Sequence, residues 1–154
     1  MMSQVEKRLR EAGFELPVAQ PSIANYVAAL EAGGLLFVSG QLPIAAGQIR
    51  YAGRVGVDLN VEEGKLAAQL CALNILSQAK AALGDLDRIV RCVRLGGFVS
   101  CDANFHQQPA VVNGASDLIV AALAEAGRHT RAAVGSSALP LNAAVEVDAI
   151  FALK

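Results

Sequence analysis

The chain has 154 residues and a formal net charge of −1, and 54% of its residues are hydrophobic while only 18% are charged. This length suits one domain (residues 1–154) with a substantial core. The sequence has no run of basic residues of the kind that would indicate a nucleic-acid-binding surface. The mean hydropathy is positive without a long uninterrupted apolar span, which argues against a membrane protein and predicts apolar surface buried between subunits.

Residues 1–16 predict an N-terminal extension that contains a short amphipathic helix. Ser3 can cap this helix, Val5 and Leu9 are its apolar residues, and Gly13 would end it. The segment is charged and has no apolar stretch of the kind that secretory signals carry.

A turn-rich segment over residues 17–24 precedes two predicted strands, at residues 26–30 and 35–38. The sequence Glu-Ala-Gly-Gly at residues 31–34 is typical of a hairpin turn between them. Ser39-Gly40-Gln41 follows at the end of the second strand. Small polar residues in this position either place backbone groups near a ligand or form a simple bend.

A long helix is expected from a cap at Asp58 or Asn60 to about Leu83, with Gly84 at its end. Its predicted buried stripe, which would face a sheet, consists of Leu66, Leu70 and Leu73, widened by Cys71 and Ile75.

Residues 88–100 predict a strand, in which Gly96-Gly97 indicates a bulge or a close backbone approach. A second helix is expected over residues 108–126, because apolar residues recur at helical spacing and Pro109 fits the first turn.

The last part of the chain, residues 128–151, contains two alternating apolar runs around a centre with Ser, Pro and Asn. This pattern predicts an antiparallel pair of strands, which would place Arg131 level with Glu146 and Asp148. A charged residue in an apolar strand needs a partner. Spacing alone favours a structural ion pair over a functional site for Arg131 and Glu146.

The predicted order is strand, strand, helix, strand, helix, strand, strand. Two helices on one face of a mixed sheet give an α+β sandwich. The other sheet face would have no helical cover, which is a second reason to expect an oligomer.

The cysteines and histidines are few and scattered. Cys71, Cys92 and Cys101 form no CxxC pattern, so we interpret them as buried, reduced thiols of a cytoplasmic protein. His106 and His129 have no second histidine at ligand spacing, so no metal site is predicted. His129, beside Arg131, either points into a ligand cleft or is an ordinary residue at the end of a strand, and we favour the second interpretation.

Several short motifs in the same order resemble the RidA (YjgF) family over most of the chain. They are Ile23-Ala24-Asn25-Tyr26, Val38-Ser39-Gly40-Gln41, Leu73-Asn74-Ile75-Leu76, Val112-Asn113, Thr130-Arg131-Ala132-Ala133-Val134, Leu139-Pro140 and Val145-Glu146-Val147.

The resemblance implies a chorismate-mutase-like fold in a homotrimer with ligand clefts between subunits. It further implies cofactor-independent hydrolysis of reactive 2-imino or enamino acids to 2-keto acids and ammonia. Arg131 would hold the substrate carboxylate, and Glu146 would activate water. Tyr26, Gly40 and Asn113 would help bind the substrate. A guanidinium can clamp a carboxylate through two hydrogen bonds, and a carboxylate can relay protons.

The chain also departs from the family pattern. Ala133 stands where many members carry Cys, and Asn25 stands where Pro is usual. The N-terminus is longer than is usual in the family, and the sequence of residues 100–107 differs from the usual family sequence between strand and helix. These departures indicate a divergent member, and fold is inherited more safely than substrate.

Two other functions remain open from the sequence. One is a trimer that binds a small carboxylate without catalysis. The other is an endoribonuclease-like activity, since some relatives carry that name, but the neutral charge and the few aromatic residues make a weak case for RNA.

Overall fold

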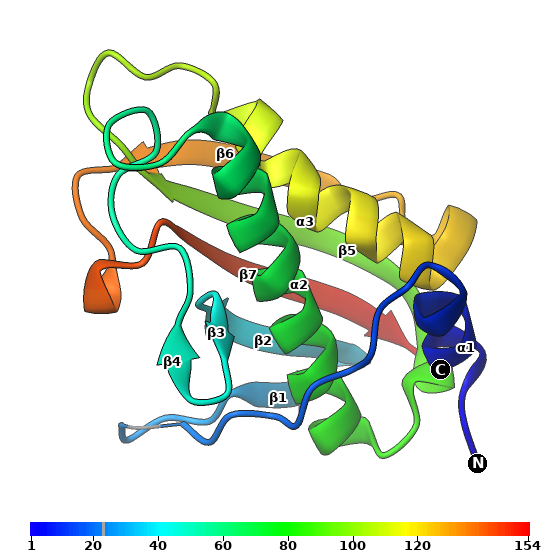
Figure 1. Ribbon diagram of the computed structural model, residues 1–154. Helices are drawn as coiled ribbons and strands as arrows, with labels where there is room; N and C mark the ends of the chain where they lie inside the picture. Colours follow the sequence, from blue (N-terminus) through cyan, green and yellow to red (C-terminus); the bar gives the residue numbers. More distant parts are fainter. Residues whose placement is uncertain (23) are drawn as a thin grey trace.

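The computed structural model describes residues 1–22 and 24–154, and Ile23, part of one family motif, lies outside the described residues. The fold has two layers, a five-stranded sheet and the helices α2 and α3 across one of its faces (Figure 1). The helical elements are α1 (Gln4–Glu11), α2 (Val61–Leu83), η1 (Leu86–Arg88), α3 (Gln108–Leu123), η2 (Ala124–Gly127) and η3 (Pro140–Asn142). The strands are β1 (Ala29–Ala32), β2 (Leu35–Gln41), β3 (Ile44–Ala45), β4 (Gln48–Ile49), β5 (Ile89–Ser100), β6 (Thr130–Ser136) and β7 (Val145–Leu153). The predicted α+β class with a mixed sheet is confirmed.

The strand order across the large sheet is β1-β2-β7-β5-β6, so β5 lies between the last two strands of the chain. β6 pairs with β5 in parallel, with Arg131 opposite Leu95, whereas β7 pairs with β5 antiparallel, with Glu146 opposite Phe98. The predicted antiparallel pairing of these two terminal strands is therefore wrong. The reason is α3, which crosses from the end of β5 back to its start and so delivers β6 parallel to β5.

Helix α2 begins at a capping box. The Asn60 side chain accepts a hydrogen bond from the Glu63 amide, and the Glu63 carboxylate accepts one from the Asn60 amide. Its buried face is rotated from the predicted leucine stripe, since Leu66 is 47% exposed and Leu70 and Leu73 are only half-buried. Smaller residues take the buried positions: Ala67, Ala68, Cys71, Ala72, Ile75, Leu76 and Ala79.

Small residues are needed there because α2 packs against α3 as well as against the sheet. A Cβ added to Gly114 of α3 would overlap the carbonyl group of Lys65 in α2. On the sheet side, a Cβ on Gly97 would meet the side chain of Val112. The predicted close approach at Gly97 is thus confirmed, while the irregularities of β5 lie nearer its start, between Ile89 and Arg94.

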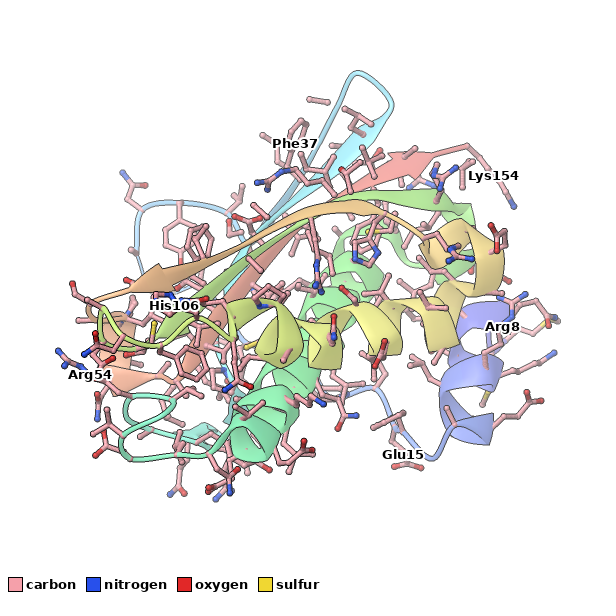
Figure 2. All side chains as sticks on the ribbon, turned by 90° about the horizontal axis from the view of Figure 1, so that it is seen from above. Arg8, Glu15, Phe37, Arg54, His106 and Lys154 are labelled. Carbon is pink, nitrogen blue, oxygen red and sulfur yellow. The ribbon has the colours of Figure 1, made fainter. Side chains whose placement is uncertain are left out.

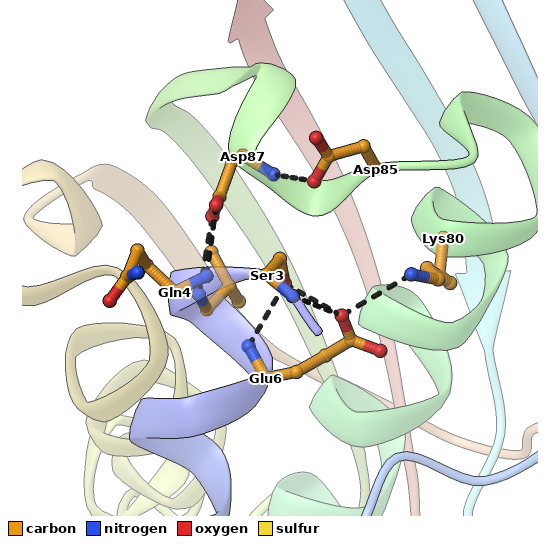
Figure 3. Close-up of polar contacts among 7 residues, drawn as sticks. Ser3, Gln4, Glu6, Lys80, Asp85 and Asp87 are labelled. Atoms are coloured by element: carbon orange, nitrogen blue, oxygen red, sulfur yellow. Dashed lines mark hydrogen bonds and ion pairs between the residues drawn. The ribbon is translucent and has the colours of Figure 1, made fainter. Parts of the chain in front are cut away.

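The N-terminal helix α1 is anchored to the end of α2 and to η1 (Figure 3). Ser3 and Glu6 form a capping box, and the Glu6 carboxylate lies 3.2 Å from Nζ of Lys80. The Asp87 carboxylate accepts hydrogen bonds from the first free amides of the helix, those of Gln4 and Val5. The predicted cap and the buried Val5 and Leu9 are confirmed.

The apolar helices belong to the core. Val61–Leu83 and Gln108–Gly127 are each long and apolar enough to cross a membrane by composition alone, but 61% and 50% of their apolar windows are buried inside the fold. Cys71, Cys92 and Cys101 are all buried and unbonded. The predicted burial of the cysteines is therefore confirmed.

The sheet face away from α2 and α3, called the open face below, carries no helix among the described residues. Figure 2 shows Phe37 pointing away from the helices on this side. Leu30, Phe37 and Ile150 form an apolar row across three strands, which Arg94 of β5 continues, and Phe37 is 41% exposed. An exposed apolar row of this kind is typical of a surface that another chain covers.

Gly114→Ala tests the close approach of the two helices. Alanine raises intrinsic helix propensity by about 1 kcal/mol, but here its Cβ would overlap the Lys65 backbone, so a net loss of about 2 kcal/mol in unfolding free energy is expected. Urea denaturation measures this change. Gly64→Ala is the matched control, because its Cβ would meet only side chains at 3.2 Å. Equal stability of the two variants would contradict the packing described.

Candidate functional site

Glu146 lies on the open face of the sheet. Strand alternation directs Val145 and Val147 into the core and turns Glu146 outward, against the backbone of Gly40 in β2. A Cβ added to Gly40 would come within 2.8 Å of the Glu146 carboxylate, so only glycine leaves room for this contact. Partial burial raises the pKa of the Glu146 carboxyl group, and the nearby carboxylate of Asp148 raises it further. This direction favours proton exchange nearer to neutral pH.

Tyr26 and Gly40 border two adjoining hollows. The larger, of about 530 Å³, lies over the open face and extends to Arg94. The smaller, of about 260 Å³, extends toward Gln78 of α2. Because both hollows include Tyr26 and Gly40, and Gly40 contacts Glu146, three of the predicted site residues come together at one corner of the sheet.

An ion pair that the sequence analysis missed lies beside this corner. Nη1 of Arg94 is 3.5 Å from Oδ1 of Asp148, and the pair packs over Gly96, where a Cβ would clash with both side chains. Burial raises the pKa of the Asp148 carboxyl group, and the Arg94 guanidinium opposes that shift. No cation among the described residues forms an ion pair with Glu146. The predicted structural pair of Arg131 with Glu146 is therefore wrong within one chain, because the register on β5 puts the two side chains on opposite faces of the sheet.

Arg131 lies on the opposite face of the sheet, beside α3. Its register partner Leu95 is fully buried under the helices, so Arg131 also points to the helix side. Nη1 donates to Oγ of Ser116 at 3.1 Å, and Nη2 donates to the carbonyl oxygen of Pro109 at 3.2 Å. The arginine is half-buried at the sheet edge, because β6 is the last strand. These two bonds use two of its five N–H donors.

Asn113 is on the same side of the fold as Arg131. It is exposed on α3, and its spacing of four residues from Pro109 and three from Ser116 places it on the helix stripe that binds the arginine. Ala133, opposite Gly97 in β5, packs against the core from the same sheet face as Arg131.

The predicted site residues therefore form two groups in one chain. Tyr26, Gly40 and Glu146 make up the carboxylate half-site on the open face. Arg131 and Asn113 make up the arginine half-site on the helix face, at the β6 edge. The sheet separates the two half-sites, and Ser116 is a residue of the arginine half-site that sequence reasoning missed, since a serine inside an apolar helix gives no signal of its partner.

The described part of the chain holds no metal cluster, and two of its three thiols are unreactive. Within residues 1–22 and 24–154, no group of three or more His, Cys, Asp and Glu side chains is placed to hold a metal ion. Burial raises the pKa of the Cys92 thiol to about 12 and that of the Cys71 thiol well above its ordinary value. These thiols stay protonated at neutral pH.

The sequence matches one protein family over nearly its whole length. A profile of the family described as YjgF/chorismate mutase-like, putative endoribonuclease matches residues 6–153. Protein TCP17 of Trypanosoma cruzi is 47% identical over 151 residues, which cover 97% of this chain and 94% of that protein.

Solved structures fall into two levels of similarity. The protein Atu1372 of Agrobacterium tumefaciens, described as having unknown function, is 53% identical with a TM-score of 0.92, over 98% of this chain and 93% of that one. RidA from the Antarctic bacterium Psychrobacter sp. PAMC 21119 is 26% identical with a TM-score of 0.62, over 88% of this chain and 94% of that one. The lower similarity to RidA agrees with the sequence-based expectation that this chain is a divergent member of the family.

Glu146→Gln tests the electrostatics of the carboxylate half-site. A raised carboxyl pKa means that ionised Glu146 destabilises the fold, and this loss grows as the pH rises through the ordinary value of about 4.3. The variant should melt about 1 to 3 °C above the parent at pH 7, and the difference should narrow toward pH 4. Calorimetry at both pH values measures this.

The exposed Glu62 supplies the control, since Glu62→Gln should change the melting temperature little at either pH. A lower melting temperature for Glu146→Gln at pH 7 would show that the ionised carboxylate is stabilised and that the electrostatic account is wrong.

Proposed function

This chain belongs to the YjgF/RidA family, and from that membership we propose that it hydrolyses reactive 2-imino or enamino acids to 2-keto acids and ammonia. The reaction takes place in clefts between the subunits of a homotrimer and uses no cofactor. A cytoplasmic location belongs to the same proposal, because reactive imino acids arise from amino-acid metabolism inside the cell.

The observation that carries this proposal is the position of the two half-sites on opposite faces of one sheet. Arg131 and Glu146 belong to strands that both pair with β5, but their register partners, Leu95 and Phe98, are an odd number of residues apart. One small substrate cannot contact both side chains of the same chain. A cleft that uses both must take the carboxylate half-site from one copy and the arginine half-site from another.

Each half-site has the chemistry that its step requires. Arg131 keeps three N–H donors beyond its bonds to α3, enough for a two-point hydrogen bond to a carboxylate. Partial burial strengthens such a contact, because less water competes for the donors. Asn113, on the same helix stripe, supplies an amide to the substrate.

Glu146 relays the protons of the hydrolysis. Its carboxylate accepts a proton from water as the water oxygen bonds to the imine carbon of the protonated C=N group. The carboxylic acid then returns that proton to the nitrogen of the tetrahedral intermediate. As the C–N bond breaks to release ammonia, the Glu146 carboxylate takes the hydroxyl proton of the intermediate, so that the neutral carbonyl forms, and passes this proton to the departing ammonia. A raised pKa suits a group that both takes and gives a proton.

Water is the nucleophile in this scheme. Ala133 occupies the position at which many family members carry Cys, so the β6 edge offers no thiol there. The buried Cys71 and Cys92 keep their protons at neutral pH. We therefore expect turnover to persist when the cysteines are replaced in a folded protein.

The alternative of a non-catalytic binder shares the same clefts. Escherichia coli TdcF, a fold relative that is 22% identical with a TM-score of 0.62 over 88% of this chain and 93% of that one, has been solved with bound serine. A small amino acid is thus a ligand that this fold accommodates in that relative. An assay of imine loss separates the two functions, because a binder does not accelerate it. RNA cleavage is weakly supported, since the net charge is −1.

The first prediction is that the protein forms a homotrimer in solution. The exposed row with Phe37 on the open face should be buried between subunits, so light scattering at micromolar concentration should give about three times the chain mass of 15.9 kDa. Phe37→Glu should lower that mass, whereas Leu66→Glu, the same change on the exposed side of α2, should not. A monodisperse monomer of the parent protein would overturn the intersubunit cleft.

Substitutions at the two half-sites should have different effects on kinetics. Arg131→Ala removes the carboxylate clamp and should weaken keto-acid binding and kcat/KM by about 30-fold or more, and Arg131→Lys should also be impaired because it loses the planar fork. Glu146→Gln should lower kcat more than ligand affinity, since the proton relay is lost while the clamp remains. Steady-state imine hydrolysis and calorimetric binding of pyruvate measure both.

The control is the oligomer mass of each variant, which should equal that of the parent, and its melting temperature, which should show a folded protein. If Arg131→Ala folds as a trimer and binds pyruvate as tightly as the parent, the clamp assignment is wrong. If the parent binds pyruvate but leaves the rate of imine loss unchanged, the protein is a binder.

A further inference from the structure

Arg131 is held by a chain of hydrogen bonds that runs through the side chains of Ser116 and His129 to a backbone carbonyl group. Nη1 of Arg131 lies 3.1 Å from Oγ of Ser116, which lies 2.9 Å from Nε2 of His129. Nδ1 of His129 is 2.6 Å from the carbonyl oxygen of Gly127. All four groups are half-buried or buried, and the chain joins α3 to the start of β6.

The two ends of the chain set the direction of its bonds. The Gly127 carbonyl only accepts, so Nδ1 of His129 carries a proton, and in the tautomer that this bond selects Nε2 is the acceptor. The Ser116 hydroxyl therefore donates to Nε2. Its oxygen lone pairs then point away from the histidine, and one of them accepts from the Arg131 guanidinium, which can only donate.

The histidine itself is rigidly placed. Gly127 is buried, and a Cβ there would lie 2.6 Å from the carbonyl oxygen of Ile119 in α3, so the turn before β6 is pressed against the helix. His129 follows two residues later and inherits this fixed position. The hydroxyl of Ser116 is thereby oriented by a ring that is tied to the packed turn through the bond from Nδ1 to the Gly127 carbonyl oxygen.

We propose that Ser116, oriented by His129, is a positioning residue that fixes the Arg131 guanidinium for a substrate carboxylate. Ser116 and the Pro109 carbonyl hold one N–H on each terminal nitrogen, so the three remaining N–H groups keep one orientation at the edge of β6. This inference rests on the proposed function, because it assigns the arginine a carboxylate ligand. It adds two residues, Ser116 and His129, to the arginine half-site.

The need for such a device follows from the place of Arg131. An arginine has four side-chain torsions, and an edge strand leaves one side of it without neighbours, so it would otherwise sample several rotamers. A guanidinium that is already oriented loses less freedom when the carboxylate binds. The benefit appears in affinity for the substrate and not in the proton relay, which belongs to Glu146 on another surface.

The test is a set of hydroxyl substitutions assayed for imine hydrolysis and pyruvate binding. Ser116→Ala should raise KM and the pyruvate Kd by about 5- to 30-fold with kcat changed less than about twofold. Ser116→Thr restores the hydroxyl and should recover most of the affinity. His129→Ala should weaken affinity in the same direction but less, because the hydroxyl remains and only its orientation is lost.

Thr130→Val is the matched control. Thr130 lies on β6 next to Arg131 and, like Ser116, carries a hydroxyl group. This hydroxyl donates to the Val93 carbonyl oxygen at 2.8 Å and makes no bond to the arginine side chain, so removing it should leave KM unchanged. A merely structural role for Ser116 would lower the melting temperature without the split between KM and kcat.

Nuclear magnetic resonance of the guanidinium nitrogens of Arg131 provides a readout that does not depend on catalysis. In the parent, the Nη1 and Nη2 protons should give separate, slowly exchanging signals, which Ser116→Ala should merge and Ser116→Thr should restore. If the parent neither hydrolyses imines nor binds pyruvate, the proposed function fails while these signals still decide the positioning role. Unchanged signals in Ser116→Ala, or an unchanged KM and Kd in an active protein, would overturn the inference.

Discussion

The position of β5 between β6 and β7 is the constraint on which the rest of the account depends. Both neighbours take their register from this strand, and side chains alternate between the two sheet faces along it. Leu95 and Phe98 thus assign Arg131 to the helix face and Glu146 to the open face. A change of one residue in either register would bring the two charges to the same face, where they could pair within one chain. The observed register keeps them apart and leaves each available to a second copy.

Packing of small residues explains how both long helices fit on one face of the sheet. Alanines and Gly64 on α2, together with Gly114 on α3, let the two helices lie close to each other over the sheet. Both long helices are used on that side, and the apolar row with Phe37 stays exposed on the other. The same arrangement leaves Glu146 on the open face, beside the Gly40 backbone and the Asp148 carboxylate. The fold and the position of the carboxylate half-site therefore follow from the same packing.

Local signals made the elements predictable from the sequence, whereas pairing between distant segments was not. The caps at Ser3 and Asn60 and the end of α2 at Gly84 were predicted, because capping depends on residues a few positions apart. The direction of β6 was missed because it depends on the crossover through α3, which alternation does not encode. The leucine stripe of α2 was misplaced because close contact with α3 favours alanine over leucine. The residues of the candidate site were named from family motifs, but the ion pair of Arg94 with Asp148 and the bond from Arg131 to Ser116 need the register and the helix position.

Mixing two inactive variants tests the shared cleft most directly. Arg131→Ala lacks the arginine half-site and Glu146→Gln lacks the proton relay, so each homotrimer should be nearly inactive. If subunits are exchanged at a 1:1 ratio by mild unfolding and refolding, about one quarter of the clefts should combine an intact Arg131 from one chain with an intact Glu146 from its neighbour. The account predicts recovery of about one quarter of the parental imine hydrolysis. If the mixed trimers stay as inactive as the separate variants, Arg131 and Glu146 do not act in the same intersubunit cleft.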